Sequence, residues 1–392
     1  MTKAITNGII VTEYAELKGK ALIFDDKILG IVDENSVNAD EIIDAEGHYI
    51  CPGLIDLHIH GYVGEDTSDG KEEGIRKIAQ ALPQNGVTAF LPTTMTVSWE
   101  EIVTAFENVR TLRPESRLPG FDGSEILGCH AEGPFINPAR KGAQAADGIL
   151  PPDADMVLPY KDIIRIITVA PEMPGGMMFV RRVTQESSMV VSIGHTSATY
   201  EQALEAIAAG ASYITHTFNA MTALNHRKPG TAGAALTANV TAELIADAFH
   251  VHPGLFSLLH VAKGEKLVLV TDCTRAGGLE DGEYTLGGQS IFVKGIECRL
   301  ADGTIAGSVL KLNVAVRNLR DLTPLPMWQA VKAASLSAAS AIGASETKGS
   351  LTPGKDADIA IFDKDCIAQK TFVRGHLKFT KGDTPHAAQS TR

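Results

Sequence analysis

The 392-residue sequence predicts an α/β fold, namely a (β/α)8 TIM-like barrel with a small β-sandwich domain formed by the N- and C-terminal segments. Three observations predict it. Apolar strand-like runs alternate with amphipathic segments in the middle of the chain, which implies parallel strands joined by crossover helices. Eight such runs can be counted, the number that closes a barrel of roughly 250 residues. Short strand-like segments with Gly, Asn and Asp turns occupy both ends.

The two ends of the chain predict one small domain made of residues 1–52 and 352–392. The first contains AITNGIIVT and GKALIFDDKILGIV, and the second contains TPGKDADIAIFD and KTFVRGHLKF. All four stretches alternate apolar and polar residues between turn residues. We expect the two ends to pair and to bracket the barrel, which takes residues 53–351.

The barrel elements follow one another along residues 53–351. GLIDLHIH is the first predicted strand, and KEEGIRKIAQALPQ is a helix with Ile75, Ile78 and Leu82 on one side. In a later helical segment, Thr199 and Gln202 have the spacing of a capping box, and Gly210 can end the helix. The other seven predicted strands are GVTAFLPTTM, EILGCHAEGPF, IIRIITVAPE, MVVSIGHTS, SYITHTFNAM, AELIADAFH and KLVLVTDCTR.

Composition excludes several classes of protein. The 35 basic and 47 acidic residues give a net charge of −12, which argues against a nucleic-acid partner. Five cysteines without a CxxC motif argue against a disulfide framework. Neither a signal peptide nor an apolar run near the ~18 residues of a membrane span is found. We therefore expect a soluble cytoplasmic protein that does not enter a membrane.

Polar residues recur at the ends of the predicted apolar strands, where a barrel opens into its active-site face. Their separations are 72, 63, 21 and 56 residues from the first strand end onward, which places them on strands 1, 3, 5, 6 and 8 if one βα unit takes about 31 residues. They are His58, His60, Glu132, His195, His216 and Asp272.

Four histidines and two carboxylates that converge would suit a borderline transition metal such as zinc or ferrous iron. Each residue alone has a structural alternative. A lone H-x-H motif or strand-end histidine is often only hydrogen-bonded, and Asp272 could cap a turn. The consistent position of all six on the barrel favours the metal site.

The chain resembles the metal-dependent amidohydrolase superfamily in PGLIDLHIHG (52–61), the TD pair (271–272) and TPGKDADIAIFD (352–363). Within it, the chain is similar to the family of deacetylases that act on N-acetylglucosamine 6-phosphate. The segments that carry this similarity are HAEGPFINPARKGAQ (130–144), IGHTSA (193–198), THTFNAMTALNHRKPG (215–230), LIADAFHVHP (244–253), VTDCTRAGG (270–278) and GTIAGSVLKLN (303–313).

The resemblance implies one or two divalent metal ions per subunit, Zn²⁺ or Fe²⁺, and a homodimer. It implies that Glu132, His195 and His216 are the principal metal ligands. His58 and His60 correspond to an additional pair that binds a second metal in some members. Asp272 corresponds to the catalytic acid and base.

The resemblance also implies the residues that bind a phosphosugar. Arg227 and His250 would hold the phosphate, and His250 would come from the neighbouring subunit. Some family members have a histidine where this chain has Gln144, and that histidine helps to polarise the scissile carbonyl. A second metal near His58 and His60 is hypothesised to take over part of this polarisation. The implied substrate-binding residues are Ala143, Gln144, Asn219, Ala220, Arg227, His250, Ala306, Gly307 and Ser308.

The implied reaction is metal-dependent hydrolysis of the acetamide of N-acetylglucosamine 6-phosphate. Another amidohydrolase, such as an N-acyl amino acid deacylase or a nucleobase deaminase, would share the fold and the ligands, so only pocket residues discriminate. Arg227 and the NAM stretch favour the phosphosugar. A catalytically inactive scaffold is disfavoured because all six strand-end residues are present.

Overall fold

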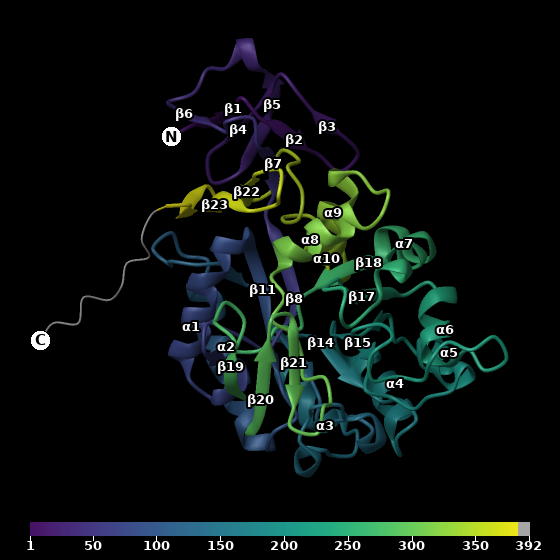
Figure 1. Ribbon diagram of the computed structural model, residues 1–392. Coiled ribbons are helices and arrows are strands. Elements are labelled where there is room, and N and C mark those ends of the chain that lie inside the picture. The colour runs from purple at the N-terminus through teal and green to yellow at the C-terminus, as the bar shows by residue number, and fades with distance from the viewer. Residues whose placement is uncertain (383–392) are drawn as a thin grey trace, which may run out of the picture.

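The computed structural model describes residues 1–382, and its central unit is the predicted barrel of eight parallel strands (Figure 1). From β11 to β18 each strand pairs in parallel with the next, apart from the short β12 (Glu125–Ile126), which pairs with β11 at the side. The strands are β8 (Leu54–Ile59), β11 (Val87–Thr94), β13 (Cys129–Glu132), β14 (Ile164–Val169), β15 (Val190–Ile193), β16 (Tyr213–Ile214), β17 (Thr241–Ile245) and β18 (Leu267–Val270).

The barrel closes between its first and last strands by contacts at their carboxyl ends. β8 pairs with β11 on one side, and Ile59 bridges Cys273 on the other. The backbone N–H of Asp272 donates to the carbonyl of His58 at 2.8 Å. The buried carboxylate of Asp56 accepts from the Thr271 hydroxyl at 2.7 Å. The closure therefore lies directly beside the predicted site.

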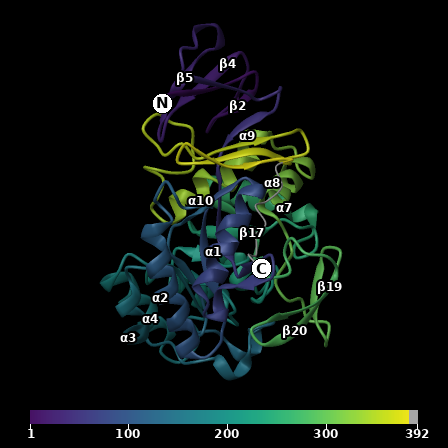
Figure 2. The same ribbon diagram turned by 90° about the vertical axis from the view of Figure 1, so that its left-hand side faces the viewer.

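Ten helices occur within residues 1–382, and most of them surround the barrel (Figures 1 and 2). The helix predicted over residues 71–84 ends early, and Pro83, which has no N–H to donate, follows in a 3₁₀ turn. The capping box of Thr199 and Gln202 is confirmed. The helices are α1 (Glu72–Ala81), α2 (Trp99–Glu115), α3 (Ala154–Val157), α4 (Gly176–Glu186), α5 (Tyr200–Ala208), α6 (Gly230–Thr237), α7 (Phe256–Lys263), α8 (Leu312–Asp321), α9 (Met327–Ala333) and α10 (Leu336–Ala341). Among residues 1–382, none of these helices has the length and apolarity of a membrane span.

The chain ends form two small mixed sheets, as predicted, at one end of the molecule (Figure 1). β7 pairs antiparallel with β22, which joins the two ends of the chain. Phe24 and Phe372 pack edge to face in the apolar cluster that the sheets share. The first sheet contains β1 (Lys3–Thr6), β4 (Lys20–Phe24), β5 (Ile28–Asp33) and β6 (Glu41–Asp44). The second contains β2 (Ile9–Val11), β3 (Glu16–Leu17), β7 (Tyr49–Pro52), β22 (Ile359–Phe362), β23 (Ala368–Val373) and β24 (His376–Thr380).

The domain boundaries at residues 52 and 352 stay a prediction, and residues 383–392 of the predicted C-terminal segment lie outside the described residues.

A three-stranded antiparallel sheet, which the sequence reading missed, lies at one edge of the barrel (Figure 2). It consists of β19 (Gly282–Leu286), β20 (Gln289–Lys294) and β21 (Glu297–Leu300). Leu286 and Ile291 pack with Met95 in a small apolar cluster. A short hairpin of β9 (Gly61–Tyr62) and β10 (Glu65–Asp66) follows β8. These insertions border the carboxyl ends of the barrel strands.

Candidate metal centre and active site

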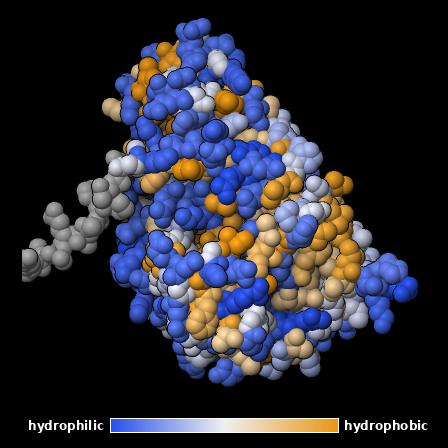
Figure 3. Space-filling view, in the orientation of Figure 1, coloured by the Kyte–Doolittle hydropathy of each residue, from blue (hydrophilic) through white to orange (hydrophobic). Residues whose placement is uncertain are grey.

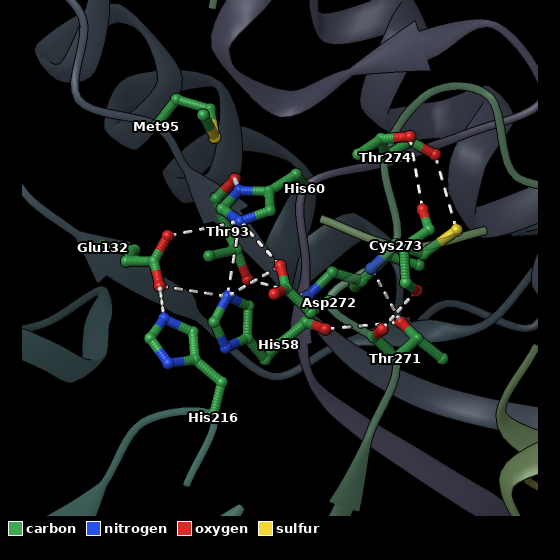
Figure 4. A network of polar contacts seen from close by, with 12 residues as sticks. His58, His60, Thr93, Met95, Glu132, His216, Thr271, Asp272, Cys273 and Thr274 are labelled. Carbon is green, nitrogen blue, oxygen red and sulfur yellow. Dashed lines mark hydrogen bonds and ion pairs between the residues drawn. The ribbon is translucent and has the colours of Figure 1, made fainter. Parts of the chain in front are cut away.

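The six strand-end residues predicted from the sequence meet at the carboxyl end of the barrel, and Figure 4 shows all of them except His195. His58 lies in β8 and His60 directly after it, and Glu132 is the last residue of β13. The other three lie two residues beyond the ends of β15, β16 and β18. All six side chains are buried, with residue exposures between 0% and 8%.

The backbone turns sharply where three of these residues leave their strands. His195, His216 and Asp272 have φ angles of 46°, 29° and 50°, in the left-handed region that residues other than glycine seldom adopt. Each such conformation costs on the order of 1–3 kcal/mol and persists only where the surrounding structure holds it. Such strain recurs at functional sites, and here it occurs at three of the six converging residues.

Glu132 lies at the centre of the group, with its two oxygens facing different histidines. Oε1 is 3.1 Å from Nε2 of His216 and 3.3 Å from Nε2 of His195. Oε2 is 3.3 Å from Nε2 of His60, and Oε1 is also 3.4 Å from Nε2 of His58. The carboxylate can therefore serve two adjacent groups of donors.

The second group is completed by Asp272. Its Oδ1 lies 3.2 Å from Nε2 of His60 and 3.4 Å from Nε2 of His58. The two sets, His58 with His60 and Asp272, and Glu132 with His195 and His216, each bring three donor atoms within 4.8 Å of one another. The geometry thus offers two neighbouring three-donor sites.

The hydrogen bonds behind the imidazoles fit metal binding. Nδ1 of His195 lies 2.8 Å from the carbonyl of Arg140, and Nδ1 of His60 lies 3.3 Å from the carbonyl of Thr93. A carbonyl can only accept, so each Nδ1 carries the proton and each Nε2 presents a lone pair to the centre. Such neutral imidazoles with carboxylates suit a divalent cation such as Zn²⁺ or Fe²⁺. The donor set therefore fits a divalent metal.

The charges of the centre support this interpretation. Burial raises the pKa of Asp272, but His58 and His60 outweigh it and lower the pKa to about 2. Burial also raises the pKa of Glu132, but His58 and His195 hold it well below its usual value. Burial lowers the pKa of His58, but Glu243, Asp272 and Glu132 raise it to about 9. Both central carboxylates are ionised, and their negative charge favours protonation of the histidines. A bound metal ion can supply this positive charge in place of the protons.

A third group of possible ligands, His58, His130 and Glu243, does not form a metal site. Both ring nitrogens of His130 are engaged, with Nδ1 3.1 Å from the carbonyl of Leu57 and Nε2 2.9 Å from the hydroxyl of Thr168. Burial lowers the pKa of His130 to about 3, so the ring is neutral and has no free lone pair for a metal.

A pocket of about 370 Å³ opens over the centre. Apolar side chains that the sequence reading missed, Met95, Leu286 and Ile305, form part of its wall. Gly307 lies at φ 56°, and a side chain there would clash with Thr274, which explains the glycine. Six of the nine predicted substrate-binding residues line the pocket: Ala143, Gln144, Asn219, Ala220, His250 and Gly307.

Gln144 contacts Glu132 in addition to lining the pocket. Its Nε2 donates to Oε2 of Glu132 at 2.6 Å, and its Oε1 accepts from the backbone N–H of Thr96 at 2.7 Å. The amide therefore anchors the carboxylate that the two donor groups share. Its predicted role toward substrate stays a prediction.

Three predicted substrate-binding residues lie away from the pocket wall. Ser308 is buried, and its N–H donates to the carbonyl of Asp272 at 2.8 Å, so it supports the end of β18. Ala306 is buried in the apolar cluster beside the three-stranded sheet. Arg227 is exposed on the loop before α6. None of these three side chains lines the pocket, and their predicted contacts with substrate stay predictions.

His250 lines the pocket of its own chain, and its expected contribution to a neighbouring subunit stays a prediction. Asp247 explains the placement. Its Oδ2 is 2.6 Å from Nδ1 of His250, and its Oδ1 accepts the backbone N–H groups of Phe249 and His250 at 2.8 Å. The turn after β17 thereby fixes the ring against the pocket.

The sequence analysis assigned no role to the acidic residues that support the centre, namely Asp56, Glu243 and Asp247. Asp56 and Glu243 are fully buried in barrel strands, and Asp247 follows β17. The signal was available, since a charged residue inside an apolar strand such as TAELI requires a buried partner.

Known proteins resemble the chain over almost its whole length. The model of the Amidohydrolase family matches residues 49–380. The chain belongs to this family. It is 40% identical to an N-acetylglucosamine-6-phosphate deacetylase of Bacillus subtilis over 94% of this chain and 95% of that protein. It is 34% identical to an N-acetylgalactosamine-6-phosphate deacetylase of Escherichia coli O157:H7, over 96% and 99%.

Among solved structures, a variant of N-acetyl-D-glucosamine-6-phosphate deacetylase from Mycobacterium smegmatis, in complex with N-acetyl-D-glucosamine 6-phosphate, matches with a TM-score of 0.88. The sequence identity is 28%, and the match covers 97% of this chain and 99% of that chain. This amidohydrolase therefore shares its entire fold with an enzyme that binds a phosphosugar.

Proposed function

We propose that this amidohydrolase hydrolyses the acetamide of N-acetylglucosamine 6-phosphate to glucosamine 6-phosphate and acetate. The observation that carries the proposal is the convergence of four imidazoles and two carboxylates at the floor of a pocket of about 370 Å³. The 40% identity to a deacetylase of this substrate supports the choice of sugar.

The residues of the centre divide the work of amide hydrolysis. Glu132, His195 and His216 would hold one divalent ion, and His58 and His60 with Asp272 would hold a second. A bound ion supplies a water of lowered pKa and polarises the amide carbonyl.

Asp272 carries the proton in this reaction. It accepts a proton from the attacking water and donates it to the amine nitrogen as the C–N bond breaks, because an unprotonated amine is a poor leaving group. The hydroxyl oxygen remains on the acyl carbon as acetate.

His250 gives the pocket a group that can bind the phosphate. Asp247 occupies its Nδ1, so Nε2 is the nitrogen free to face a ligand. Asn219, Ala220 and Gly307 line the same pocket and would contact the sugar. Binding a phosphate remote from the scissile bond orients the amide and contributes to catalysis.

Arg227 would reach the phosphate only from another subunit. It lies on an exposed loop that projects from the molecule beside α5 and α6 (Figure 1). Leu255, Leu258 and Val261 are exposed on and next to the adjacent α7, where Figure 3 shows an apolar surface. We therefore propose a homodimer in which Arg227, rather than His250, completes the neighbouring site.

A complementation experiment tests this arrangement. Arg227→Ala and Asp272→Asn chains, each inactive at low substrate concentration, are refolded together in equal amounts. If Arg227 acts on its neighbour, random dimers restore about a quarter of the sites. If it acts within its own chain, mixing restores no activity.

The function itself is tested by offering metal-loaded enzyme three substrates and measuring acetate and free amine. We expect turnover of N-acetylglucosamine 6-phosphate and far less of unphosphorylated N-acetylglucosamine. N-acetylgalactosamine 6-phosphate is the second candidate substrate, because a relative that is 34% identical acts on it. Turnover of N-acetyl amino acids with none of either phosphosugar would refute the proposal.

A further inference from the structure

Glu243 is a fully buried carboxylate in β17, directly behind the candidate metal centre. Its neighbours along the strand, Ala242 and Leu244, are buried and apolar. Burial of a carboxylate is costly unless hydrogen bonds offset it. The contacts of Glu243 therefore show what this carboxylate supports.

One oxygen of Glu243 contacts both halves of the centre. Oε2 lies 3.0 Å from Nδ1 of His58, and it accepts the backbone N–H of His216 at 2.7 Å. His58 belongs to one group of three donors, and His216 belongs to the other. Both hydrogen bonds of Oε2 therefore go to predicted metal ligands, and the hydroxyl of the buried Tyr213 also lies close enough to the carboxylate to interact with it.

We propose that Glu243 is a positioning residue that sets both metal sites at once, an inference that rests on the proposed metal-dependent function. Toward His58 it fixes the tautomer, because a proton on Nδ1 leaves the lone pair of Nε2 for the centre. Toward His216 it holds the backbone turn, which has a φ of 29° and gains stability from the bonded N–H.

The geometry around His58 shows what depends on this contact. Its Nε2 lies 3.4 Å from both Glu132 and Asp272 and 3.3 Å from Nε2 of His60. If the ring carried its proton on Nε2 instead, it would donate to these carboxylates and could not bind a metal. The carboxylate of Glu243 opposes that tautomer, since it can only accept.

Two substitutions separate the shape of Glu243 from its charge. In Glu243→Leu both hydrogen bonds are lost, whereas in Glu243→Gln the amide oxygen can still accept from both donors. Glu125→Gln is the matched control. Glu125 is a buried carboxylate of the short strand β12, and it pairs with Lys348 at 2.6 Å instead of with the predicted ligands.

Metal affinity is measured on the folded proteins by competition with a chromophoric chelator, and bound metal is counted by mass spectrometry, both without substrate. We expect Glu243→Leu to lose about 10–100-fold in affinity for zinc, the usual effect of removing a partner behind a ligating histidine. Glu243→Gln should lose less but stay weaker than wild type. Glu125→Gln should bind zinc like wild type even where its melting temperature falls.

Wild-type zinc affinity and stoichiometry in Glu243→Leu would overturn the inference. If that variant does not fold, wild-type affinity in Glu243→Gln together with an unchanged pH profile of kcat would overturn it. The proposed function fails separately: zinc binding that depends on Glu243, without turnover of any N-acetyl hexosamine phosphate, leaves the positioning role intact and removes the substrate.

Discussion

Two clusters of buried carboxylates are stabilised in different ways. At the carboxyl end of the barrel, which we call the mouth, Glu132 and Asp272 face the Nε2 atoms of surrounding histidines. At the junction of barrel and small sheets, Nζ of Lys348 lies 2.6 Å from Glu125 and 2.8 Å from both Asp356 and Asp358. We refer to Lys348, Glu125, Asp356 and Asp358 as the junction cluster.

The difference lies in where the compensating cation comes from. In the junction cluster the cations are side chains of the protein, because Lys27 also pairs with Asp356 and Arg117 with Glu125, so the charges are balanced permanently and the site serves stability. At the mouth the donors converge on a centre that an exchangeable metal can occupy, so folding, metal binding and proton transfer are coupled there. A buried carboxylate paired with its own lysine is thus inert, whereas one left to a metal can take part in chemistry.

The largest expected effect is the loss of turnover that Asp272→Asn should cause at the mouth. The amide cannot accept the proton of the attacking water, so kcat should fall by about 10²–10⁴-fold. The fold should persist, and metal should still bind through Glu132, His195 and His216. Turnover and metal content are measured on the same preparation, and wild-type turnover would remove Asp272 from the chemistry.

The next effect should fall on stability alone, from Lys348→Met in the junction cluster. Removing the lysine leaves the buried Asp358 without a counter-charge, whereas Lys27 still pairs with Asp356 and Arg117 still pairs with Glu125. The loss should cost about 3–5 kcal/mol of unfolding free energy. Urea denaturation measures this loss, and kcat per folded molecule should match wild type. A fall in kcat comparable to that of Asp272→Asn would mean that the two clusters are not independent.

A subtler effect distinguishes the two halves of the mouth. His58→Ala should lower the metal content from about two ions per subunit toward one, since Glu132, His195 and His216 remain to bind the other. Metal is counted by mass spectrometry, and zinc is titrated back after chelation. An unchanged content would indicate that the wild-type centre holds one ion.

The comparison also shows what the sequence could and could not predict. The six residues of the mouth were predictable because the carboxyl ends of parallel strands must meet at one face of a barrel. The partners Glu243 of His58 and Glu125 of Lys348 lie 185 and 223 residues away, and no local pattern encodes such pairings.

Loop placement was the least predictable feature. His250 was predicted as a binding residue from the resemblance, but the sequence does not show that Asp247 holds its ring against the pocket of its own chain. The β19–β21 sheet was not predicted from the sequence, although Leu286 of that sheet forms part of the pocket wall.

The smallest expected effect is the pH dependence of the junction cluster. Burial raises the pKa of Asp356, but Lys348 and Lys27 outweigh it and lower the pKa. A carboxylate whose pKa is lower in the folded than in the unfolded protein stabilises the fold at pH values above its unfolded pKa, near 3.9. This stabilisation is lost as the pH falls through the pKa of the folded protein. Burial raises the pKa of Asp358, so this carboxylate is protonated first and contributes with the opposite sign.

As these carboxylates are protonated, Lys348 remains buried but loses its counter-charges. The buried lysine then destabilises the fold instead of stabilising it. The stability gap between wild type and Lys348→Met should therefore narrow as the pH is lowered from 7 toward 3.5, as urea denaturation at each pH would measure. A gap that stays constant over this range would mean that Lys348 contributes through packing of its aliphatic chain rather than through its charge.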